Sequence, residues 1–167
     1  ALFESGQIDV LMSADPFQPL SSPDYQQAFL LNVPMVAIAG QASALSGRKS
    51  VSVEELGAVD WAGFHGDDSL FHNANNLMAR HGLPAPNIVM RTNSIEALTE
   101  FVAGTSAVTV VTKHLAEKMK PAGLSSLNVE KPLWDIPVSL ISRQIAWNID
   151  PMRCFRQLVN DGLREIL

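Results

Sequence analysis

Residues 92–111, TNSIEALTEFVAGTSAVTVV, constrain the fold most because they combine a helix start, a helix end and a buried strand. Asn93 is predicted to cap the helix by accepting from the backbone N–H of Glu96, whose side chain can reach back as in a capping box. Gly104 suits the left-handed position that ends a helix, and the β-branched residues 108–111 favour a strand. Four apolar residues share one helical face: Ile95, Leu98, Phe101 and Val102.

The start of this predicted helix is also a candidate binding site. Backbone N–H groups without intrahelical partners and a partial positive charge gather at a helix start. A small anionic or polar ligand can therefore bind there. The alternative interpretation of Asn93 is a cap with no ligand contact, and the sequence leaves both open.

Composition places the chain among globular proteins and argues against nucleic-acid binding by this segment. Of 167 residues, 47% are apolar and 17% are charged, a balance that supports a buried core. The net charge of −5 offers no concentrated basic surface for phosphates. The single cysteine, Cys154, excludes an intramolecular disulfide and is predicted to be a packed thiol. No apolar run reaches the length of a membrane-spanning helix.

Strand and helix patterns alternate along the rest of the chain. Strands are predicted at residues 8–12, 28–31, 35–39, 59–64, 88–90, 127–129 and 136–142, and Pro34 is predicted to mark a strand edge, a bulge or a crossing point of the chain. Helices are predicted after a capping box at Ser52, from Asp67 or Asp68 to a stop at His81 and Gly82, over 112–120 and from Asp150. The last helix has an apolar stripe that must pack on something: Met152, Phe155, Val159, Leu163 and Ile166. This alternation predicts an α/β fold with largely parallel sheets.

Four motifs follow one another along the chain: residues 2–10, with Gly6 before an apolar-Asp-apolar strand; residues 36–45; residues 53–56; and the run from Thr92 to Val111. In their sequence and their order they resemble the effector-binding domain of LysR-type transcriptional regulators. The resemblance covers essentially the whole chain. It departs from the family pattern at Ser106 and Thr112, where a glycine and a proline are common, and at Ser43-Ala44, which replace a His-Pro pair.

The resemblance implies a fold like that of type 2 periplasmic binding proteins, with two α/β lobes joined by two crossing strands. Residues 1–32 and 143–167 would form part of lobe I, and residues 33–142 would form lobe II. The chain opens on an apparent helix end, and the family's first strand and helix have no counterpart, so we expect a fragment.

The resemblance also implies a function. The domain would sense a small polar or anionic metabolite in the interlobe cleft and control DNA binding by an N-terminal winged helix-turn-helix. The regulator would be cytoplasmic, with no membrane contact, and would assemble as a homodimer or homotetramer. No cofactor, metal or catalytic residue is expected.

The family positions imply ligand contacts at Ser13, Ala14, Ser69, Leu70, Thr92, Asn93 and Ser94. Two of these positions lie at predicted helix starts, where free N–H groups favour a carboxylate. Ser13 follows a strand, at the end where α/β proteins bind ligands. Arg91 can also pair with a carboxylate, but its alternation with Met90 predicts a solvated side chain.

Other functions have weaker support in the sequence. His65 and His72 lack the spacing of a metal site, and no nucleophile and base pair can be drawn. The rivals are an extracytoplasmic solute receptor of the same fold, which an upstream signal peptide would favour, and an enzyme on that fold, such as a dehydratase of a carboxylic acid. Turnover of a bound ligand would reveal the enzyme.

Overall fold

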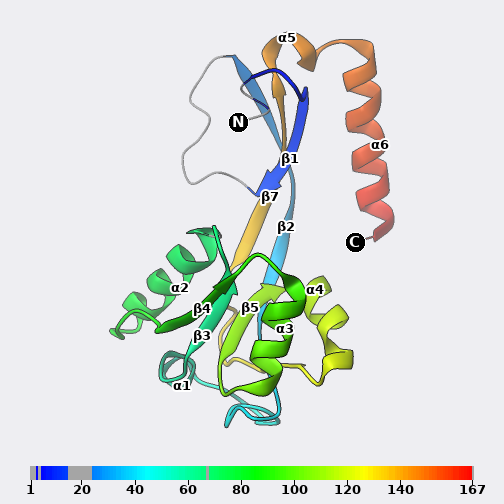
Figure 1. The fold of residues 1–167 in the computed structure, drawn as a ribbon. Coiled ribbons are helices and arrows are strands. Elements are labelled where there is room, and N and C mark those ends of the chain that lie inside the picture. Colours follow the sequence, from blue (N-terminus) through cyan, green and yellow to red (C-terminus); the bar gives the residue numbers. More distant parts are fainter. Residues whose placement is uncertain (1–2, 4, 15–23, 67, 167) are drawn as a thin grey trace. The chain divides into compact units, whose positions relative to one another are not determined.

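The structure is a computed structural model that describes residues 3, 5–14, 24–66 and 68–166 (Figure 1). The predicted loop after Ser13 falls mostly outside these residues. The chain divides into two compact units: unit 1 is Ala1–Val33 with Ile136–Leu167, and unit 2 is Pro34–Asp135. The chain passes between the units twice, within two long strands, β2 (Tyr25–Ala39) and β7 (Asp135–Arg143). The expected lobe boundaries stay a prediction.

The described residues of unit 1 form three strands and two helices. Strand β1 (Val10–Ala14) pairs antiparallel with β7, from Val10 opposite Ser142 to Ala14 opposite Val138, and β7 lies next to β2. Helices α5 (Gln144–Trp147) and α6 (Asp150–Ile166) follow β7. Leu140 and Ile141 are each 1% exposed, so the middle of β7 supplies the core of this unit.

Two predictions for helix α6 are wrong. Met152 is buried, but Phe155 from the predicted apolar stripe is 41% exposed. Cys154, expected to be packed, is also exposed. The helix is amphipathic as predicted, but packing on its neighbours buries only part of its apolar stripe.

Unit 2 alternates strands and helices. Its elements are α1 (Val53–Gly57), β3 (Trp61–Phe64), α2 (Asp68–Arg80), β4 (Ile88–Thr92), α3 (Ile95–Gly104), β5 (Val108–Thr112), α4 (Lys113–Met119), η1 (Lys120–Ala122) and β6 (Ser125–Ser126). Strand β3 pairs parallel with β4 and β5. Strand β2 pairs antiparallel with β5 and β6. The prediction of largely parallel sheets is therefore wrong, because the long strands β2 and β7 run against their neighbours.

Strand β2 continues through Pro34, the position at which the sequence predicted a strand edge, a bulge or a crossing point. Pro34 is exposed and stands directly before the paired segment, in which Met35 lies opposite Thr112. The Met35 N–H donates to Trp134 O at 3.1 Å. The ladder therefore needs no donor at position 34, and the proline is tolerated.

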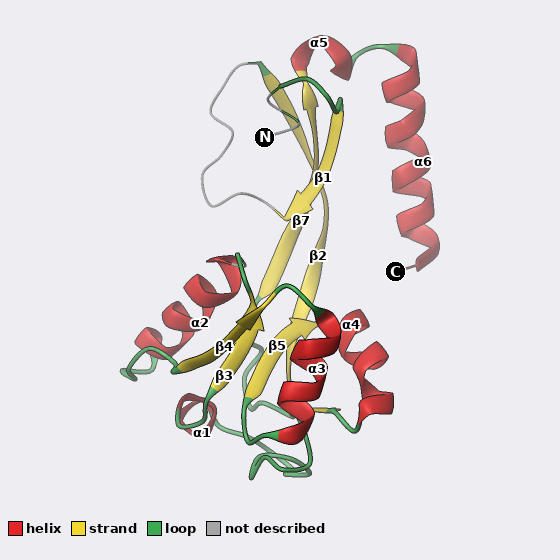
Figure 2. Ribbon diagram, in the orientation of Figure 1, coloured by secondary structure: helices red, strands yellow, loops and turns green. Residues whose placement is uncertain are grey.

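The core of unit 2 lies between the sheet and its helices, which cover both faces (Figure 2). One cluster joins Ile38 and Val111 of the sheet to Leu98 and Val102 of α3. Trp61 is fully buried, and its indole N–H donates to Leu56 O at 2.9 Å. The Ser52 capping box forms as predicted at the start of α1.

The end of helix α3 differs from the prediction. Gly104 belongs to the helix, and its φ is not positive. Thr105 ends the helix in an extended conformation, and its hydroxyl donates to Phe101 O at 2.8 Å. A side-chain hydrogen bond therefore takes the place of the expected left-handed glycine.

Candidate functional site

The carboxyl ends of β3 and β4 lie side by side in unit 2, and a helix begins after each of them. Phe64 lies opposite Thr92, and the His65 N–H donates to Thr92 O at 2.8 Å. We call residues 65, 66, 68–70 and 91–97 the unit 2 edge. Ligands of open α/β sheets bind at this end of the strands, so the edge is the first candidate site.

The turn from Thr92 to Ser94 is held by its own side chains. The Ser94 N–H donates to Thr92 Oγ1 at 3.1 Å, and the Ala97 N–H donates to Ser94 Oγ at 3.1 Å. Ser94 is therefore the N-cap, and the prediction that Asn93 caps this helix is wrong. The helix begins one residue later than predicted, which leaves Asn93 exposed in the turn.

A carboxylate already lies at the start of α3. Ser94 Oγ donates to Glu96 Oε2 at 2.8 Å. The Glu96 backbone N–H and then the Ser94 hydroxyl hold the pKa of the Glu96 carboxyl below its ordinary value. The same donors that favour this anion would favour the carboxylate of a ligand.

Arg91 adds a positive charge to the unit 2 edge. It is exposed, and its guanidinium lies over the ring of Phe71 on α2, 3.9 Å from the centroid. The exposure agrees with the sequence prediction, but the stacking on Phe71 was not foreseen. Because the ring restricts the guanidinium, Arg91 is a better candidate for pairing with a carboxylate than a freely solvated arginine would be.

The predicted contacts divide between the two units. In unit 2, Ser69 and Thr92 are half-buried, whereas Leu70 is 1% exposed with its side chain in the core. Any ligand contact from Leu70 must therefore come from its backbone. In unit 1, Ser13 is half-buried opposite Ser139, and Ala14 is exposed at the end of β1. The ligand contacts of all seven residues stay predictions.

Other kinds of site find little support in the described part of the chain. No group of three potential metal ligands lies close enough together to hold an ion among these residues. His81, at the end of α2, has Nδ1 3.8 Å from Glu54 Oε1. Within the same residues, no helix is both long and apolar enough to cross a membrane.

Comparison with known proteins places the chain in a family. The family model described as the LysR substrate binding domain matches residues 1–164. This chain belongs to that family. The resemblance seen in the sequence is therefore confirmed, and so is the periplasmic-binding-protein-like α/β fold. No curated protein sequence matches the chain significantly.

Solved structures of LysR regulatory domains share the fold at low sequence identity. The regulatory domain of Synechocystis PCC6803 CcmR, in complex with 2-PG, is 16% identical, with a TM-score of 0.78 over 97% of this chain and 76% of that one. The effector binding domain of QuiR, in complex with shikimate, is 13% identical, with a TM-score of 0.78 over 98% and 76%. The regulatory domain of Pseudomonas aeruginosa MexT is 17% identical, with a TM-score of 0.74 over 95% and 74%. The chain spans only 51% of a Corynebacterium glutamicum OxyR mutant.

Proposed function

We propose that this chain is the effector-sensing part of a LysR-type transcription regulator. A small polar or anionic metabolite binds at the unit 2 edge, and Ser13 and Ala14 of unit 1 are proposed ligand contacts because of the family resemblance. DNA binding belongs to a winged helix-turn-helix domain of the same regulator, which works in the cytoplasm as a dimer or tetramer. The domain senses its ligand and does not transform it.

The observation that carries the proposal is the unit 2 edge itself, in a chain that belongs to the LysR family. Thr92, Ser94 and Arg91 place a hydroxyl, a helix start and a guanidinium within one short segment. The start of α3 adds backbone N–H groups that favour an anionic ligand. The CcmR and QuiR domains, which share the fold, bind 2-PG and shikimate, and both names support a small organic ligand.

Thermal shift of the regulator that contains this chain tests the proposal. The probes are 2-PG, shikimate and a panel of small hydroxy acids and sugar phosphates, each in excess. A ligand at about 100 times its Kd adds about 2.7 kcal/mol to the stability of the folded state, which raises Tm by several degrees.

The Arg91→Gln variant then tests the site with any probe that stabilises the protein. We expect its thermal shift to fall, whereas Arg80→Gln, which removes the same charge from the exposed end of α2, should leave the shift unchanged. Chemical conversion of the bound probe would instead favour an enzyme. If no anionic or polar probe raises Tm, the proposed ligand class is wrong.

A further inference from the structure

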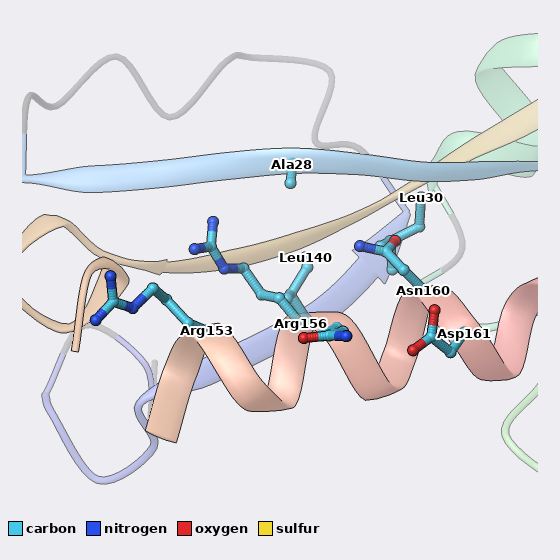
Figure 3. A pocket seen from close by; sticks show the side chains of 8 residues that line it. Ala28, Leu30, Leu140, Arg153, Arg156, Asn160 and Asp161 are labelled. Atoms are coloured by element: carbon cyan, nitrogen blue, oxygen red, sulfur yellow. The ribbon is translucent and has the colours of Figure 1, made fainter. Parts of the chain in front are cut away.

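Helix α6 and the strands β2 and β7 line an open cavity that shares no residue with the unit 2 edge (Figure 3). Its volume is about 420 Å³, within the range of about 300–1,000 Å³ found for small-molecule sites. The strand side is apolar, with Ala28 and Leu30 from β2 and Leu140 from β7. The helix side is polar and includes two arginines, Arg153 and Arg156, and one carboxylate, Asp161. The cavity therefore has an apolar wall facing a charged one.

Arg156 is the residue that marks this cavity as a binding site. Its guanidinium reaches from α6 toward β2 (Figure 3) and lies over the Trp147 ring, 4.2 Å from the centroid. Its Nε is buried and has no hydrogen-bond partner in the described part of the chain. A buried guanidinium N–H without an acceptor is costly, and such groups commonly mark a ligand or ion position.

Asp161 also lines the cavity, but it has an interaction of its own, and Arg156 Nε stays without a partner in the described part of the chain. Asp150 forms its ion pair with Arg153, at the exposed start of the helix. Asn160 reaches toward the same strand as Arg156 and adds an amide to the polar wall (Figure 3). Since Arg153 is already paired, the positive charge that remains for a ligand is that of Arg156, which suits a monoanion.

We propose that this cavity binds a small organic monocarboxylate. The carboxylate accepts hydrogen bonds from Arg156, because a guanidinium matches a carboxylate in shape and charge. The apolar body of the ligand lies against Ala28, Leu30 and Leu140. This site shares no residue with the effector site proposed above, and all its residues belong to unit 1.

Binding of hexanoate, with hexanamide as its neutral counterpart, tests the proposal on the intact chain. The reporter is the indole N–H resonance of Trp147, assigned with Trp147→Phe, because Trp147 stacks on Arg156. We expect hexanoate to move this resonance saturably at millimolar concentration and hexanamide to bind at least about tenfold more weakly.

Three variants assign the binding to the cavity. Arg156→Gln should weaken hexanoate binding by at least about tenfold, while Arg80→Gln, in unit 2, should leave it unchanged. Ala28→Leu fills the apolar side and should also weaken binding with Arg156 intact, so it tests the cavity even if Arg156→Gln fails to fold.

Two results would overturn this site. In one, hexanoate does not move the Trp147 resonance at concentrations up to about 20 mM. In the other, Arg156→Gln and Ala28→Leu bind hexanoate as the unchanged protein does. Loss of hexanoate binding in Arg91→Gln but not in Arg156→Gln would place the ligand at the unit 2 edge and would also refute the unit 1 site.

Discussion

At the scale of single residues, two glycines show how packing decides what a position tolerates. Gly40 is buried after β2, and an added Cβ there would lie 2.5 Å from Val102 O and 2.7 Å from the Cα of Ala103. These are backbone atoms of α3, so no rotamer change can relieve the contact. A Cβ at Gly104, at the end of the same helix, would meet nothing within 4 Å.

We therefore expect opposite effects from replacing these glycines with alanine. Gly40→Ala should lower the free energy of unfolding by about 1–3 kcal/mol through overpacking. Gly104→Ala should leave it unchanged or raise it by up to about 1 kcal/mol, because alanine favours a helix. Urea denaturation of the two variants measures both. An equal loss of stability in both would contradict the close approach of α3 to Gly40.

Ser94 and Asn93 allow an equally direct test of the helix start. Ser94→Ala removes the hydroxyl that accepts from Ala97 N and should cost about 1 kcal/mol of stability. Asn93→Ala should change stability by less than about 0.5 kcal/mol, because the side chain is exposed. Urea denaturation again measures the difference. A larger loss of stability in Asn93→Ala than in Ser94→Ala would instead support Asn93 as the N-cap, as the sequence predicted.

At the scale of an element, the capping box of α1 links helix stability to pH. The Ser52 N–H donates to Glu55 Oε2 at 3.0 Å, and the Glu55 N–H donates to Ser52 Oγ at 3.2 Å. The Ser52 backbone N–H, opposed by partial desolvation and helped by Arg48, lowers the pKa of Glu55 below its ordinary value of 4.5. A lowered pKa in the folded state stabilises the protein above the unfolded pKa.

The Glu55→Gln variant isolates this contribution, because glutamine keeps the shape of the cap without the charge. We expect the unchanged protein to be more stable than the variant above about pH 5, and the difference to shrink as the pH falls through the folded pKa of Glu55. Thermal unfolding from pH 3 to pH 7 measures it. If about 1 M NaCl removes the difference, the Arg48 ion pair, and not the Ser52 N–H, is its source.

Helix α6 shows that an amphipathic pattern does not say which residues will be covered. Its sequence predicts a stripe that includes Met152 and Phe155, and only Met152 is buried. Polar residues of the same helix, Arg156 and Asn160, line the cavity beside β2 and β7. Periodicity defines the face of a helix, but contacts with other elements decide how much of that face is buried.

At the scale of the whole molecule, the proposed ligand contacts include residues of each unit, and the contacts of each unit can be tested separately. For any ligand that raises Tm, Ala14→Glu in unit 1 and Thr92→Val in unit 2 should each reduce the thermal shift. The first adds a charge that repels an anion, and the second removes a hydroxyl. Ligand stabilisation depends on Kd as RT ln(1 + [L]/Kd), so a tenfold weaker complex loses about 1.4 kcal/mol when ligand is in excess.

A normal thermal shift in one variant contradicts a different part of the proposal than normal shifts in both. A normal shift in Ala14→Glu with a reduced one in Thr92→Val would confine the ligand to unit 2. Normal shifts in both would place the ligand elsewhere and contradict the proposed site. Arg80→Gln again serves as the control for a change of surface charge.

The sequence by itself predicted the features that depend on neighbouring residues. These include the strand, helix and strand of residues 88–112, the Ser52 capping box, the end of α2 before Gly82, and the motif order that identifies the LysR family. Each depends on spacing, capping or β-branching within a few residues. The general position of the candidate site followed from the same local signals, because helix starts can be recognised in a sequence.

Only the tertiary structure decided the features that depend on distant contacts. The sheet is mixed because β2 and β7 run against their neighbours, and no local pattern encodes the direction of a partner strand. The N-cap is Ser94 and not the predicted Asn93. The N-cap is the residue at which the backbone leaves the helix, and sequence spacing locates that residue only approximately. The guanidinium of Arg91 lies over the ring of Phe71, and that of Arg156 lies over the ring of Trp147, each on another element of the fold. Such pairings arise when the fold brings distant segments together, so they appear only in three dimensions.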